Sequence, residues 1–171
     1  MLKKVTKMKQ KLIELKACEA ARNWAGDKTI EEIWSTCHRG DWMLWLAKEV
    51  NVDKRLLTLA KGRCAETVIH LMKDERSINA VKIAIAYGNN EVTDRGLADA
   101  AYAADAAAAA DAAAYAAYAA AAAAADAAYA AAAAAATAAY AKKENQLLTA
   151  NIIRELVPFN ELSELLNHDT N

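Results

Sequence analysis

The fold is decided by the alanine-rich segment of residues 98–141, which reads ADAAYAADAAAAADAAAYAAYAAAAAAADAAYAAAAAAATAAYA. Alanine occupies 34 of these 44 positions, and no Gly or Pro occurs between Leu97 and Val157. Because Ala has the highest helix propensity, we expect a helix even where the segment packs on nothing. A single helix from Asp94 to Lys143 would be about 75 Å long, whereas a compact domain of this size has a radius of gyration of about 16 Å. The sequence therefore predicts a long alanine-rich helix that either projects from the body or is broken into two.

Between Asp111 and Tyr140, the residues other than alanine form one stripe along this helix. Tyr118, Tyr129 and Tyr140 are eleven residues apart, and Tyr115 and Asp126 have the same spacing. Eleven residues make three turns of a nearly straight helix, so all five share one face. In one interpretation the hydroxyls and carboxylates form a binding face. We favour a second, in which the rings fill gaps between alanine-faced helices and the Asp side chains keep the helix soluble.

The remaining faces of the alanine-rich helix carry almost only methyl groups. Small side chains let neighbouring helix backbones approach closely. An apolar surface of this extent is typical of an interface. We therefore predict a homo-oligomer that assembles through the alanine faces.

The rest of the chain predicts an all-α fold, a bundle of about seven helices in a single domain of residues 1–171. With only one Pro and five Gly, and no long stretch of period two, the sequence offers no strand signal. Residues 1–97 form a Trp- and Leu-rich part, residues 98–141 the alanine-rich helix, and residues 142–171 the C-terminal helices. The helices before the alanine segment are expected over about 2–25, 29–39, 42–50, 53–71 and 77–87. After Lys142-Lys143, helices are expected up to Pro158 and over 161–166.

Capping residues set several of these boundaries. Thr29 with Glu32 makes a capping box at one helix start, and Asp53 is placed to cap another. Gly40 is expected to break a helix, and Asp41 to act as N-cap of the next. Arg39-Gly40-Asp41 spells an adhesion tripeptide, but these local roles account for the Gly and the Asp without adhesion, and Arg39 stays unexplained.

Charge and cysteine usage favour a cytoplasmic protein. The net charge is −1, which argues against a general polyanion binder. Residues 1–17 hold six Lys against Glu14; this end could contact nucleic acid or a membrane, but we favour a solvated helix. The three cysteines include no CxxC pair, and no signal peptide is visible. The alanine run is too often interrupted to be a membrane span. We expect neither a membrane nor a specific nucleic acid as partner.

No nucleotide-binding, hydrolase or metalloprotease motif is present, so we expect no enzyme and no cofactor. Cys37 and His38, with Cys18 and Cys64, match no zinc spacing, and we expect no metal.

The richest cluster of chemistry-bearing residues combines Trp and Arg, which suit stacking on a base or binding a phosphate. A structural interpretation is a Trp-filled core in which Arg39 or Arg55 bridges Asp41 or Glu66. We favour the structural one, because Trp42 and Trp45 lie at the spacing of a buried helix face. The candidate cluster consists of Trp34, Arg39, Asp41, Trp42, Trp45, Arg55 and Arg63.

The stretch from Trp34 to Ala47, which reads WSTCHRGDWMLWLA, resembles a family of immunity proteins of bacterial toxin systems that also occurs in bacteriophages. The resemblance extends to residues 17–20, 53–65 and 151–154 and to the Tyr-punctuated alanine tract. It implies a cytoplasmic inhibitor that neutralises a toxin or defence effector by binding it, and it carries no catalytic residues.

Two alternatives stay open. One is a phage anti-defence sponge that sequesters a nucleotide-like immune signal through Arg39, Arg55 and the Trp cluster or the Tyr stripe. The other is an ice-binding protein, because one antifreeze class has alanine-rich helices with an eleven-residue repeat. That class carries Thr where this chain carries Tyr, which makes ice binding the weaker alternative.

Overall fold

The structure is a computed structural model that describes the backbone of residues 7–105 and 127–168, and the side chains of residues 7–105 and 142–167. Every element in this part of the chain is helical, as the sequence predicts, and none is a strand. The first half comprises α1 (Lys7–Glu14), α2 (Glu19–Ala25), α3 (Ile30–Thr36), α4 (Gly40–Glu49), α5 (Lys54–Glu66), the 3-10 turn η1 (Ile69–Leu71) and α6 (Glu75–Gly88). Residues 94–105 are also helical, and α8 (Ala127–Leu156) and α9 (Phe159–His168) close the chain.

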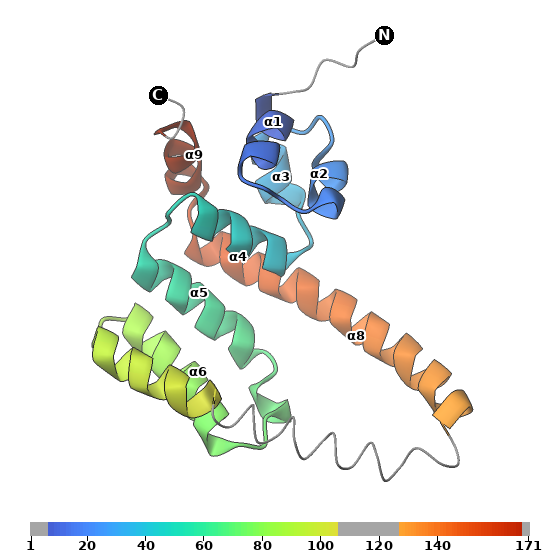
Figure 1. Cartoon of the computed structure of the whole chain (residues 1–171), viewed down its shortest axis with the longest axis vertical. Coiled ribbons are helices and arrows are strands. Elements are labelled where there is room, and N and C mark those ends of the chain that lie inside the picture. The colour runs from blue at the N-terminus through green and yellow to red at the C-terminus, as the bar shows by residue number, and fades with distance from the viewer. Residues whose placement is uncertain (1–6, 106–126, 169–171) are drawn as a thin grey trace.

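The long helix α8 organises the molecule (Figure 1). Its C-terminal half packs against α4 and α5, and α6 packs on α5. The short helices α1, α2 and α3 gather with α9 near the C-terminal end of α8, whereas the segment 127–141 extends past α4 (Figure 1). One core cluster joins α1–α5 to α8 and α9, and its most buried large side chains are Val50, Ile153, Val157 and Leu162.

Two predicted N-caps are confirmed. Thr29 and Glu32 form the capping box at α3, with a Thr29 N to Glu32 Oε2 distance of 2.7 Å and a Glu32 N to Thr29 Oγ1 distance of 3.2 Å. At the start of α5, the Asp53 carboxylate accepts hydrogen bonds from the backbone N–H groups of Arg55 and Leu56. Each cap satisfies N–H groups that have no partner inside the helix.

The prediction of one continuous helix over residues 2–25 is wrong, because α1 ends at Glu14. Lys16 adopts a left-handed conformation with φ 61° and donates to Ile13 O, while the Ala17 N–H donates to Leu12 O. This pair of bonds is a Schellman motif, which usually has Gly at the left-handed position. Leu12 and Ala17 are both buried, so apolar burial offsets the conformational cost of a left-handed Lys.

The expected roles of Gly40 and Asp41 are also wrong. Gly40 is the first residue of α4, Arg39 is its N-cap, and Asp41 lies in the first turn. A Cβ added to Gly40 would lie 2.8 Å from Thr149 Cβ and 3.0 Å from Ala150 N, so glycine lets α4 approach α8. Its reason for being Gly is therefore a helix contact and not a helix stop.

Two further boundaries differ from the prediction. The helix expected over residues 53–71 ends at Glu66, and the turn η1 follows separately. The closing helix does not begin after Lys142-Lys143, because α8 passes through both residues without interruption. No Gly or Pro occurs between Leu97 and this pair, so nothing in the local sequence ends the helix there.

The alanine-rich segment is described at its two ends only. Residues 98–105 and 127–141 are helical, while Tyr115, Tyr118 and Asp126 lie outside the described residues. Tyr129 and Tyr140 belong to α8, but their side chains lie outside the described part. Whether the segment is one helix or two therefore stays a prediction. Among the described residues, no helix has the length and apolarity needed to cross a membrane.

Candidate functional site

Two tryptophans and two cations form a continuous stack on the side of α2 and α4. The rings of Trp24 and Trp42 lie 6.0 Å apart and tilted by 57°. The Lys28 ammonium lies 4.6 Å from the Trp24 ring, and the Arg39 guanidinium lies 4.5 Å from the Trp42 ring. All four side chains are partly exposed. We call Lys28, Trp24, Trp42 and Arg39 the tryptophan stack.

Both cations of the stack are held in place by hydrogen bonds. Arg39 donates two parallel hydrogen bonds to the Asp41 carboxylate, from Nε to Oδ1 at 2.8 Å and from Nη2 to Oδ2 at 2.5 Å. These bonds lower the pKa of the Asp41 carboxyl, and the carboxylate raises the pKa of Arg39. Lys28 Nζ donates to Trp24 O at 2.5 Å. The stack is therefore ordered before any ligand arrives.

A groove opens beside Arg39, between α4, α5 and α8. Its volume is about 470 Å³, and its polar lining comes from the start of α4 and from α8, whereas α5 contributes Cys64 and Ala65. Thr149 on α8 lies at the close contact with Gly40, so the groove floor lies where α4 and α8 approach most closely. The residues that give it chemical character are Arg39, Asp41, Lys142, Asn145, Gln146 and Thr149.

The other predicted tryptophans belong to the core. Trp34 is 4% exposed and belongs to the core cluster, and Trp45 packs against that cluster. With Trp24 and Trp42 they line a cavity of about 30 Å³, about the size of one water and walled almost wholly by apolar side chains. This supports the structural interpretation for Trp34 and Trp45.

The end of α3 is capped from α8 by Arg154. Its Nε donates to Trp34 O at 2.7 Å, Nη2 donates to Cys37 O, and Nη1 bonds Asn151 Oδ1 at 2.8 Å. Carbonyls at the end of a helix lack partners inside the helix. One guanidinium therefore fixes the turn that leads to Arg39, which is a member of the tryptophan stack.

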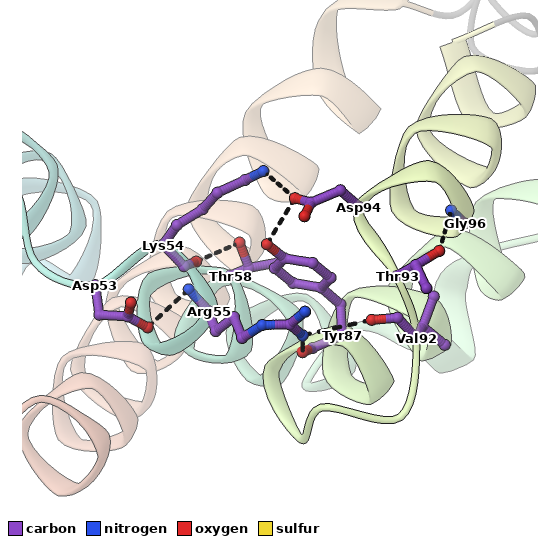
Figure 2. Close-up of polar contacts among 9 residues, drawn as sticks. All are labelled: Asp53, Lys54, Arg55, Thr58, Tyr87, Val92, Thr93, Asp94 and Gly96. Carbon is purple, nitrogen blue, oxygen red and sulfur yellow. Dashed lines mark hydrogen bonds and ion pairs between the residues drawn. The ribbon is translucent and has the colours of Figure 1, made fainter.

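Arg55 lies in a different cluster, shown in Figure 2. Its guanidinium stacks on Tyr87 at 4.2 Å, and Nη1 donates to Tyr87 O at 2.5 Å. The Tyr87 hydroxyl donates to Asp94 Oδ1 at 2.9 Å, and Lys54 pairs with the same carboxylate. These bonds, that of Lys54 first, lower the pKa of Asp94. The cluster fastens the start of the 94–105 helix to α5 and α6. The Arg55 guanidinium is engaged by Tyr87 within this cluster.

The candidate cluster is therefore divided by the fold. Arg39, Asp41 and Trp42 come together, as one half of the structural interpretation anticipates. Arg63 pairs instead with Glu66 on the surface, Nη1 to Oε2 at 2.9 Å. Arg55 and Arg63 line neither the groove nor the tryptophan cavity.

The cysteines do not assemble a metal site, and no group of three metal-ligating side chains occurs in the described part of the chain. Cys18 is exposed, whereas Cys37 is buried and donates to Arg39 O at 3.5 Å. Burial raises the pKa of Cys37, and it raises that of Cys64 to about 11. The raised pKa values disfavour the thiolate, which is the nucleophilic form, at both cysteines.

Sequence reasoning missed Trp24, Lys28 and Lys142. The four-residue spacing of Trp24 and Lys28 is no helical signal, because α2 ends at Ala25 and Lys28 lies in the turn after Gly26. No local signal marks Lys142, which enters the groove only because α8 crosses α4.

The chain was compared with known proteins in three ways, and no family model, curated protein or solved structure matches it. The resemblance to immunity proteins therefore stays an expectation.

Proposed function

We propose that this protein is a non-catalytic binding protein of the immunity or inhibitor type, which neutralises a toxin or defence effector in a stoichiometric complex. The contact surface is the tryptophan stack together with the adjoining groove of α4, α5 and α8. One observation carries the proposal: Arg39 is held between Asp41 and Trp42 at the edge of that groove.

Trp and Arg are the residue types most enriched at binding hot spots. Trp24 and Trp42 are only half-buried, so each keeps part of its surface open to a partner. Because Asp41 and Trp42 already fix Arg39, binding loses little side-chain entropy. These properties favour a protein surface as the target.

The proposal is tested with the partner isolated from the natural host by pull-down, with eluates analysed for proteins and small molecules. Titration calorimetry with that partner should give a fixed stoichiometry and no continuing heat of turnover. Arg39→Ala should weaken binding by more than tenfold, while Tyr102→Ala, at a residue 79% exposed on another helix, should not. Conversion of many partner molecules by one protein molecule would refute the proposal.

A second candidate function is a sponge for a nucleotide-like signal. It is favoured by the groove volume of about 470 Å³, which falls in the range of small-molecule sites, and by the two cations Arg39 and Lys142 that line it. Arg55 does not join Arg39 and the Trp cluster, and the side chains of the Tyr stripe lie outside the described residues, so the support for a sponge comes from the groove. Loss of ligand binding in Lys142→Ala and Gln146→Ala, with Trp24→Ala unaffected, would favour the sponge.

We further propose that the protein forms a homo-oligomer through its alanine faces. The evidence is the sequence of residues 98–141, since the side chains of residues 106–141 lie outside the described part. Sedimentation velocity should show association that Ala133→Leu weakens, because a larger side chain keeps the helix backbones apart. A monomer at every concentration would contradict it.

A further inference from the structure

A second and larger groove lies between α1 and α9, closed at one side by the turn that leads into α3. Figure 1 shows α9 beside α1 and α3 at one end of the molecule. The groove volume is about 750 Å³. Its apolar lining comes from Met8, Ile30 and Leu166, one from each wall. Its charged lining consists of Lys7, Lys11 and Lys28 against Glu14 and Asp27, a net charge of +1.

The two lysines lack the partners that such charges usually have. Lys7 and Lys11 are one helical turn apart on α1, where like charges repel by a few tenths of a kcal/mol. Within the described residues neither forms an ion pair, although Glu14 lies on the same helix. Glu14 instead accepts a hydrogen bond from Gln10 at 3.2 Å. An anionic group in the groove would remove this repulsion.

We propose that this groove docks an acidic amphipathic helix of a partner protein. Its apolar face would lie on Met8, Ile30 and Leu166, and its carboxylates would face Lys7 and Lys11. A helix fits because both long walls are helices, and because helix-in-groove recognition needs an apolar floor with charges along the rim. The eight residues of α1 span about 12 Å, which corresponds to two turns of a docked helix.

This proposal goes beyond the proposed function and does not depend on it, because the groove is lined by neither Arg39 nor Trp42. Lys28 belongs to both surfaces, but its ammonium is already bound to Trp24 O. Lys7 and Lys11 are therefore the cations of this groove that a ligand can pair with, and the docked helix would place its carboxylates beside them and away from Glu14 and Asp27, which also line the groove.

The test uses the full chain and a fluorescein-labelled helical peptide of three heptads, with Leu at the a and d positions and Glu at most others. Fluorescence anisotropy should show saturable binding that weakens with added salt. The double variant Lys7→Glu with Lys11→Glu should weaken it at least tenfold. The matched control, Lys61→Glu with Lys73→Glu, makes the same change of net charge at exposed lysines elsewhere and should bind like the unaltered protein.

Three results would overturn the proposal. The first is the absence of saturable binding, and the second is an equal loss in both double variants, which would mean that net charge alone attracts the peptide. The third is binding to vesicles of anionic phospholipid or to duplex DNA, with the same dependence on Lys7 and Lys11 and with no binding of the peptide.

Discussion

Replacing Arg154 with Met should uncouple α8 from the end of α3. Met keeps an unbranched stem of similar length but removes every donor. The carbonyls of Trp34 and Cys37 then lose their charged partner, since Arg154 bonds both. The third bond, to Asn151, lies on the helix surface within α8 and should contribute little.

The magnitude follows from the two carbonyl bonds. A hydrogen bond to a charged group contributes about 1.5–3 kcal/mol net, and the half-buried position of Arg154 places each at the low end. Two such bonds give a loss of about 3 kcal/mol in the free energy of unfolding. For a chain of this length that corresponds to a fall in Tm of about 6–12 °C. Arg154→Lys should lose about half as much, because an ammonium is a single point donor and cannot span both carbonyls.

Urea denaturation followed by circular dichroism measures the change, with the midpoint compared at equal slope. The matched control is Arg95→Met, at a side chain that is 92% exposed and lies 4.0 Å from its partner Asp99. Arg95→Met should leave the midpoint unchanged. If Arg154→Met unfolds at the same urea concentration as Arg95→Met, the cap contributes nothing and the reasoning is wrong.

Three further predictions concern packing, thiols and acid. Gly62→Ala should lower the free energy of unfolding by about 1–2 kcal/mol despite better helix propensity, because the added Cβ would lie 2.9 Å from Ile85 Cγ1 and 3.1 Å from Ile85 N; urea denaturation checks it. In thiol labelling of the folded protein, exposed Cys18 should react first, and Cys37, which is 2% exposed, should react only as fast as the structure opens. The bonds from Arg76 lower the pKa of Asp74 to about 2 in the folded state, against about 3.9 unfolded, so the stability they supply is present above pH 4 and is lost as the pH falls toward 2. Asp74→Asn should flatten the dependence of the urea midpoint on pH over that window.

Local signals in the sequence were enough for the helix class and for several caps. The capping box of Thr29 and Glu32 and the cap at Asp53 need only residues within one turn, so their chemistry can be read directly. The break at Lys16 could not be read, because a Schellman motif there depends on the burial of Leu12 and Ala17 and not on a Gly.

Contacts between residues that are far apart in the sequence could not be predicted from it. Gly40 looks like a helix stop in the sequence, and only its contact with Thr149 shows that it is a packing residue. Arg55 looks like a neighbour of the Trp cluster, yet Tyr87 holds it elsewhere. The pairing of Arg39 with Asp41 was partly foreseen because the two are separated by one residue.

Burial separates Trp34 from the other three tryptophans, which are all partly exposed and pack against the core cluster. Trp34 is buried in that cluster, where truncation of a large aromatic leaves a cavity and costs about 3–5 kcal/mol of stability. Trp24 has a structural side too, because it packs against the cluster and meets His38 edge-on with ring centroids 6.0 Å apart. Its contact with Lys28 is worth only about 0.5–1 kcal/mol at an exposed site. Trp34→Ala should therefore lower the free energy of unfolding by more than Trp24→Ala does, and under the proposed function Trp24→Ala should weaken binding to the partner.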